Sequence, residues 1–168
     1  MARNNAWSNY RLHEACAKLT TEDYMVARIS FFPSIHLTLN HILQADRRYL
    51  DRLEGRDPDP DAHDEVFNFA KLRKRQATMD RALIAFCEAL APVDLDREIV
   101  IRRPYGVWPN PIGAILTHLF MHQIHHRGQV HAMLSGTPVP PPQLDEFFLS
   151  EDAEHRRKEM IAMGLPPD

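Results

Sequence analysis

The positions of the prolines constrain the fold of this chain more than any other feature of the sequence. The 168 residues include 13 prolines, and these lie outside the long stretches in which apolar residues recur at helical spacing. Because proline lacks a backbone N–H and clashes with the preceding helical turn, it marks the beginning or the end of a helix. We therefore expect four long helices, at about residues 4–18, 34–53, 62–90 and 111–134.

Residues that start and stop helices lie beside these boundaries. Ser34 is a good N-cap for the second helix, and Gly55 is a typical stop signal at its end. A short helical turn capped by a threonine is expected at residues 20–23. Asn110 and Pro111 predict the start of the fourth long helix, with Asn110 as the N-cap and Pro111 at the first helical position.

The segment between the third and fourth helices has a different pattern. Residues 98–102 form a short run with three β-branched residues at 99–101, which predicts a strand-like or extended crossover, and residues 104–109 predict a turn-rich loop. A polar helix is expected at residues 150–163. The chain is thus predicted to be all-α: a four-helix bundle with an extended crossover before the last bundle helix and a C-terminal tail helix. We expect the bundle to span residues 1–148 and the tail helix, packed on the bundle or extending from it, to span residues 149–168.

Composition and charge favour a soluble globular protein without a nucleic-acid partner. Apolar residues make up 44% and charged residues 26%, both near the average for globular domains, and the net charge is −3. Local basic clusters alternate with acids, which predicts solvated helix faces. No apolar run approaches about 18 residues and no signal peptide opens the chain, so we expect a cytoplasmic protein without a membrane segment. Cys16 and Cys87 are too few for a disulfide framework and are expected to be small buried hydrophobic residues.

Histidines are unusually frequent in the fourth long helix. Five of the 10 histidines lie between residues 118 and 131. At about 100° per residue, His122 and His126 fall one turn apart at the border of the apolar face, so their rings can converge on one point. His118 and His125 lie further round, toward solvent or a partner. Two imidazoles at positions i and i+4 are a known metal-binding arrangement, although the same spacing also occurs in ordinary surface pairs.

A metal site needs at least one further ligand. The second helix offers His36 and His41, whereas the remaining histidines outside the fourth helix lie near boundaries or in polar stretches. On the helical wheel His41 lies about 130° from the centre of the apolar face, so we expect it to be more exposed than His122. Leu37 and Ala45 flank His41, which also allows that side to face a neighbouring helix.

Two charged residues fall on apolar helix faces. Asp46 lies near the centre of the apolar face of the second helix, and Arg127 lies among core residues of the fourth, together with Gln123. A buried carboxylate is costly unless it is paired. We predict a buried, hydrogen-bonded pair of Asp46 and Arg127 that fixes the second helix against the fourth. The alternative is an Asp46 side chain that turns toward a loop.

Several of these segments together resemble the DinB family, also called the DinB/YfiT superfamily of metalloenzymes. The resemblance covers residues 4–148, and its most specific part is the run from His118 to Gln129, which ends in His-His-Arg-Gly-Gln. Further matching segments are residues 9–10, 31–43, 45–47, 53–55 and 111–116. The resemblance implies a four-helix bundle, frequent homodimers, and a metal site formed by one histidine of the second helix and two of the fourth. By position these ligands are His41, His122 and His126. Characterised relatives include transferases and isomerases that use low-molecular-weight thiols.

A site of three neutral imidazoles leaves a coordination position open, which is the pattern of catalytic metal sites. Zinc, nickel and ferrous iron all accept such ligands. The expected chemistry is a transfer in which a metal-activated thiolate, or water, attacks an electrophilic substrate; the alternative is a non-catalytic metal-binding bundle or a dimeric stress protein. Gln129 is a candidate for orienting water or substrate, or else faces solvent. Tyr105 and Trp108 are candidates for closing over the pocket, or else pack on the core.

Overall fold

The computed structural model describes residues 1–58, 64–103, 105–145 and 149–167. In chain order the described part contains six α-helices, two short 3₁₀ turns and one antiparallel pair of strands. The helices are α1 (Ala2–Cys16), α2 (Thr21–Met25), α3 (Ile35–Leu53), α4 (Phe69–Glu88), α5 (Ile112–Leu134) and α6 (Ala153–Ala162). The strands are β1 (Glu98–Arg103) and β2 (Gly106–Pro111), and the 3₁₀ turns are Pro92–Asp96 and Ser150–Asp152.

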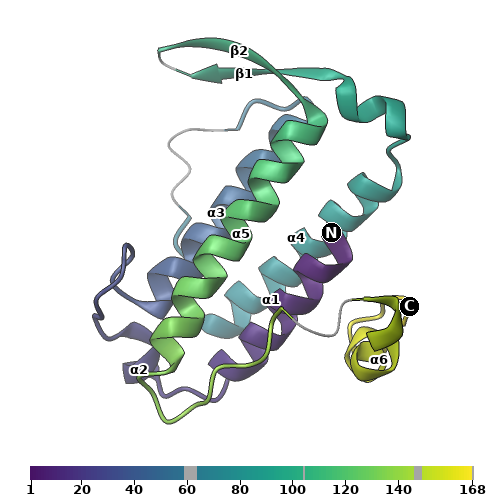
Figure 1. Cartoon of the computed structure of the whole chain (residues 1–168). Helices are drawn as coiled ribbons and strands as arrows, with labels where there is room; N and C mark the ends of the chain where they lie inside the picture. Colours follow the sequence, from purple (N-terminus) through teal and green to yellow (C-terminus); the bar gives the residue numbers. More distant parts are fainter. Residues whose placement is uncertain (59–63, 104, 146–148, 168) are drawn as a thin grey trace.

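Helices α1, α3, α4 and α5 form the predicted four-helix bundle. Helix α3 packs against α5 and helix α1 against α4, with further contacts between α3 and α4 and between α1 and α5 (Figure 1). One apolar cluster lies toward α2 and contains Leu12, Leu39, Ile42, Leu72 and Leu134. A second lies toward the hairpin and contains Leu50, Leu83, Ile101, Ile112 and Leu119. Each fully buried side chain of this kind contributes roughly 1.5–3 kcal/mol of hydrophobic stabilisation.

Side-chain caps set the helix starts as the sequence predicts in two places. The Ser34 hydroxyl accepts a hydrogen bond from the Leu37 backbone N–H at 3.1 Å and so begins α3. The Thr20 hydroxyl accepts from the Asp23 N–H at 3.0 Å and begins the short helix α2. Gly55 follows α3 with φ of +77°, a left-handed conformation in which glycine carries no steric penalty.

Helix α4 starts later than expected. The apolar spacing predicts a helix from residue 62, which lies outside the described residues, but residues 64–68 are not helical and α4 begins at Phe69. Asn40 of α3 explains the difference, since its side chain accepts from the Val66 N–H at 2.7 Å and donates to the Val66 carbonyl at 3.3 Å. Asn68 then caps α4 by accepting from the Lys71 N–H at 2.9 Å. The apolar side chain of Val66 is therefore buried, although Val66 lies in a loop and not in helix α4.

The extended crossover before the last bundle helix is a β-hairpin. Strands β1 and β2 pair antiparallel, with Ile101 opposite Trp108, so the prediction of a turn-rich loop over residues 104–109 is wrong for residues 106–109. A two-stranded ribbon has only edge strands, which accept prolines where a central strand would not. Gly106 has φ of +154°, and a Cβ at this position would overlap the Trp108 ring.

The predicted start of α5 is also corrected in detail. Asn110 does not cap the helix, because its amide donates instead to the Trp108 carbonyl at 3.1 Å. Pro111 occupies the N-cap position and α5 begins at Ile112, one residue later than expected. The Ile112 N–H finds its partner in the Arg97 carbonyl at 3.0 Å, so the preceding segment and not a side chain satisfies this end of the helix.

Helix α6 confirms the expected C-terminal tail helix. Its Met160 is buried, and Glu159 accepts a hydrogen bond at 2.6 Å from the indole N–H of Trp7 on α1. The predicted division after residue 148 falls beside residues 146–148, which lie outside the described residues, and stays a prediction. None of the helices in the described part of the chain has both the length and the apolar character needed to cross a membrane.

Candidate metal centre

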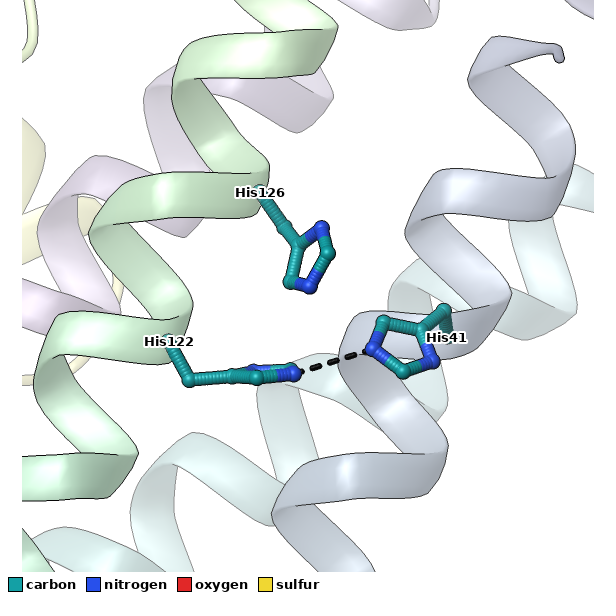
Figure 2. Close-up of side chains that lie close together, drawn as sticks. All are labelled: His41, His122 and His126. Atoms are coloured by element: carbon teal, nitrogen blue, oxygen red, sulfur yellow. Dashed lines mark hydrogen bonds between the residues drawn. The ribbon is translucent and has the colours of Figure 1, made fainter. Parts of the chain in front are cut away.

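Three histidines from two helices converge between α3 and α5. His41 extends from α3, and His122 and His126 extend from successive turns of α5 (Figure 2). One candidate ligand atom from each residue can be chosen so that all three atoms lie within 4.8 Å of one another. The His41 Nε2 and His122 Nε2 atoms are 2.9 Å apart, and the three rings have centroids 4.4 to 4.9 Å apart. The structure therefore brings together the three residues that the resemblance implies.

The other histidines near the site take different roles. His36, the second candidate on α3, is buried on another side of the helix, with its Nε2 2.6 Å from Glu65 and its Nδ1 3.3 Å from the Asn40 amide. His118 and His125 are exposed, as the helical wheel predicts. His41 and His122 are both partly buried, so the expectation that His41 is the more exposed of the two stays a prediction. The wheel of α3 alone does not include α5, which covers this side of α3.

Burial keeps the imidazoles of the cluster neutral. The pKa of His41 is lowered to about 4, chiefly by desolvation and in smaller part by the nearby His126 and Arg48. Desolvation also lowers the pKa of His122 to about 4, with His126 and His41 acting in the same direction. The pKa of His126 is lowered by burial as well, although its hydrogen bond to Gln129 opposes the shift. Metal ligation requires unprotonated imidazole, and these rings meet that requirement at neutral pH.

Gln129 fixes the orientation of one ligand. Its Oε1 lies 2.8 Å from His126 Nδ1, and its amide nitrogen lies 3.1 Å from His125 Nε2. An amide oxygen only accepts hydrogen bonds, so Nδ1 of His126 carries the hydrogen and Nε2 keeps its lone pair for a ligand. Gln129 thus acts on a ring of the cluster, a role that differs from both predicted ones.

Phe32 is part of the site and was not predicted to be. Its ring centroid lies 4.3 Å from that of His41 and 5.6 Å from that of His126. The sequence offers one signal for this placement: Phe32 directly precedes Pro33 and the Ser34 cap, so it sits at the entrance to α3 on the way to His41. The apolar ring of Phe32 therefore packs against two of the three imidazoles.

The other side of the cluster opens onto a cleft of about 620 Å³ between α3 and the hairpin. Its described lining consists of His41, Ala45, Arg48, Tyr49, Arg52, Asp57, Pro58, Val100, Arg102, Tyr105 and His122. An adjoining cavity of about 410 Å³ shares Tyr49 and Tyr105 with the cleft and also contains Trp108 and His118. Tyr105 lines the cleft, whereas Trp108 lines only the adjoining cavity and contacts Tyr105 at a centroid distance of 5.5 Å; that the two rings close over the site stays a prediction.

Comparison with known proteins agrees with this geometry. The sequence profile of the DinB family matches residues 1–159. The chain belongs to the DinB family. A curated relative, Protein DinB of Bacillus subtilis (strain 168), is 25% identical over 137 residues, which cover 77% of this chain and 80% of the relative. The DinB fold is a four-helix bundle, in agreement with the arrangement of α1, α3, α4 and α5.

The donor set of this DinB family member fits a divalent metal ion. Around a tetrahedral ion with metal–nitrogen bonds of about 2.0–2.1 Å, neighbouring ligand nitrogens lie roughly 3.3 Å apart. The observed separations, 2.9 Å for His41 and His122 and at most 4.8 Å within the cluster, reach this value with small rotations of the rings. Without a metal ion, the His41 and His122 nitrogens share a hydrogen bond in which one ring donates and the other accepts; a bound cation would replace the shared hydrogen. Three histidines suit zinc, nickel and ferrous iron alike.

Below the histidines, the DinB bundle contains a buried polar network that joins its four helices. Its members are Asn5 and Asn9 of α1, Asp46 of α3, Gln76 and Asp80 of α4, and Gln123 and Arg127 of α5, all at most 6% exposed. Asp46 accepts hydrogen bonds from Gln76, at 2.8 Å, and from Gln123. Buried polar groups are tolerated because they are hydrogen-bonded to one another.

The predicted direct pair of Asp46 and Arg127 is wrong. Both side chains are buried, but among the described residues no hydrogen bond joins them, and Gln123 lies between. Arg127 donates to the Asn5 and Asn9 side chains of α1 and to the side-chain amide oxygen of Gln123. The amide nitrogen of Gln123 in turn donates to the Asp46 carboxylate. Gln123, one turn before Arg127 on α5, therefore bridges the two groups, because its side-chain amide is hydrogen-bonded to both the guanidinium and the carboxylate.

Proposed function

We propose that this DinB family member binds one divalent metal ion through His41, His122 and His126 and catalyses the transfer of a small electrophilic substrate to a low-molecular-weight thiol. The observation that carries the proposal is the convergence of three neutral imidazoles at the edge of a cleft of about 620 Å³. Clefts of this size hold small organic molecules. A metal ion held by three histidines keeps a position open, where it lowers the pKa of a thiol or a water molecule.

The protein's own side chains prepare this site in three ways. Gln129 holds the His126 ring in the tautomer that leaves Nε2 unprotonated. Phe32 packs against the rings of His41 and His126, and ligands reach the histidines from the cleft. Tyr105, 73% exposed on the hairpin, lies at the mouth of that cleft. Each of these roles places or protects a ligand nitrogen, and none needs a nucleophile from the chain.

The two cysteines support an external thiol as the nucleophile. Cys16 is buried in the core, and desolvation raises the pKa of its thiol to about 12, so it is not a thiolate at neutral pH. Cys87 is half-buried on α4, packs against the cluster near the hairpin, and has its pKa raised by burial. Neither cysteine lines the cleft that contains His41 and His122. A thiol reaction at this site therefore calls for a thiol that enters from solution.

The experiment has two stages. Elemental analysis of protein purified without a His-tag measures which metal is bound and how much. The metal-loaded protein is then incubated with low-molecular-weight thiols and a panel of alkylating and arylating electrophiles, and loss of free thiol is followed. We expect thiol consumption that His122→Ala abolishes and His118→Ala retains. A metal-loaded protein that is inactive with every pair, and that unfolds when the metal is chelated, supports the alternative of a purely structural ion.

We also propose that two copies of the chain associate. Support comes from α5, where the side chains of Met121 and Ile124 are 66% and 55% exposed, an unusual position for large apolar groups. Light scattering at several concentrations measures the mass, which we expect to be twice the 19.4 kDa of one chain. A monomer mass at all concentrations contradicts this part of the proposal.

A further inference from the structure

The cleft beside the histidines is lined by an excess of positive charge. Three of its described side chains are arginines, Arg48 and Arg52 of α3 and Arg102 of β1, against one carboxylate, Asp57. These cations come from segments about fifty residues apart that the hairpin brings together over α3 (Figure 1). A cleft walled by protein focuses such charge and attracts anions.

Arg48 lines the cleft beside His41 and has an unsatisfied hydrogen-bond donor. It lies two helical turns after His41, with the small Ala45 between them on the same face, so its side chain and the histidine border the same space. The Nε atom of Arg48 is buried and has no hydrogen-bond partner in the described structure. Within the described structure, the Arg48 guanidinium donates a hydrogen bond of 3.3 Å from Nη2 to the Gln44 amide oxygen. A buried guanidinium N–H without a partner is costly unless a bound group accepts from it.

Two of the acids that the structure describes near Arg48 pair with another group. Asp51 and Glu54, the acidic residues that follow Arg48 on and just after α3, both pair with Arg56. Among the described residues, no carboxylate forms an ion pair with Arg48 or with Arg102. The third arginine, Arg52, lies over the Tyr49 ring with its guanidinium carbon 5.8 Å from the centroid. In the described part of the chain, the guanidinium groups of Arg48 and Arg102 therefore have no carboxylate partner.

We propose that the cleft recognises a small organic anion, whose carboxylate or phosphate group is held by Arg48 and Arg102 while its reactive carbon lies beside His41 and His122. This inference rests on the proposed function, since it names the class of substrate for the same site. Guanidinium groups offer paired N–H donors that match the two oxygens of a carboxylate or phosphate. The anion accepts hydrogen bonds from the arginine side chains that line the cleft, and this contact orients the rest of the molecule toward the histidines.

Calorimetric titration of the untagged, full-length protein with succinate, inorganic phosphate and neutral succinamide tests the proposal. We expect binding of at least one of the two anions and no binding of succinamide, and the tighter anion identifies the group that the cleft prefers. Arg48→Gln and Arg102→Gln are each expected to weaken binding about tenfold or more. The matched control is Arg157→Gln, which removes one exposed arginine of α6 that pairs with Glu154. Because Arg102 is exposed on the hairpin, its replacement does not depend on core packing.

The metal content of every sample is measured alongside the titration, so the two proposals fail separately. Wild-type protein that contains metal but binds neither anion overturns the anion proposal and leaves the metal site intact. Protein that binds an anion but no metal overturns the proposed function and supports the anion site. Equal binding of succinate and succinamide, or undiminished anion binding in both arginine variants, shows that the arginines do not recognise the anion.

Discussion

Replacing Asp80 by asparagine tests how the buried polar network is charged. Asp80 is 6% exposed and accepts hydrogen bonds from the Asn9 amide at 2.9 Å and the Gln76 amide at 3.2 Å. The pKa of its carboxyl is raised to about 7, chiefly by burial and also by the neighbouring Asp46, while the hydrogen bonds from Asn9 and Gln76 and the charge of Arg127 offset part of the rise. In the unfolded chain the pKa returns to about 3.9. The folded state therefore holds the protonated form more tightly than the unfolded state does.

The sign and size of the effect follow from this difference. A carboxyl with a raised folded-state pKa stabilises the fold fully below about pH 4, and that contribution is lost as the pH rises through about 7. One pKa unit corresponds to about 1.4 kcal/mol, so the loss amounts to roughly 4 kcal/mol. Asparagine keeps the shape but does not titrate. The free energy of unfolding of the wild type, minus that of Asp80→Asn, should fall by roughly 4 kcal/mol between pH 4 and pH 8.

Urea unfolding followed by circular dichroism, at five pH values and constant ionic strength, measures this difference. Comparing the two proteins cancels the opposite contribution of His13, His41 and His122, whose lowered pKa values make the fold more stable as the pH rises toward 6.5. The exposed Asp96→Asn variant serves as control for the loss of one negative charge. A wild-type minus Asp80→Asn difference that stays constant across the pH range would refute the reasoning.

Three further changes test other parts of the structure. Gln129→Ala should weaken metal affinity about 10–100-fold, because His126 loses the acceptor that fixes its tautomer; competition with a chromogenic chelator measures this, and unchanged affinity contradicts it. Ser34→Ala should lower the free energy of unfolding by about 1 kcal/mol through loss of the α3 cap, as judged by urea unfolding at pH 7, whereas no change would show that the cap contributes nothing. Metal occupancy, measured after dialysis, should stay constant from pH 7 to pH 5 and fall below about pH 4, since burial lowers the pKa of His41 and His122 to about 4; full occupancy at pH 3 argues against histidine ligands.

Local signals in the sequence predict much of this fold. The Ser34 cap and the Gly55 stop bound α3 to within a residue, because capping depends on groups close together in the chain. The placement of His122 and His126 on adjacent turns also follows from helical geometry alone. The position of His41 beside them does not, since the wheel of α3 predicts that His41 is more exposed than His122; the family resemblance, and not periodicity, implies that His41 joins the cluster.

Contacts between distant residues account for the errors. The wheels place both Asp46 and Arg127 in the core but do not reveal that the Gln123 amide separates them. The late start of α4 depends on Asn40, a residue of another helix that captures the backbone of Val66. Side chains that interact across the fold leave no periodic signal in either segment.

The cleft shows the same limit. Its arginines come from α3 and β1, and nothing in either segment indicates that they line one space. Only the turn of the hairpin over α3 brings Arg102 near Arg48 and the histidines. A charge pattern that looks like an ordinary solvated helix face in the sequence thus becomes one wall of a candidate substrate site.

Elemental analysis of untagged wild type, His118→Ala and His122→Ala tests the central claim most directly. His118 lies one turn before His122 on the same helix but is exposed and outside the cluster, so it controls for the loss of a histidine. We predict about one metal ion per chain in the wild type and in His118→Ala, and none above background in His122→Ala. A full equivalent of metal in His122→Ala, or none in the wild type, would contradict the account.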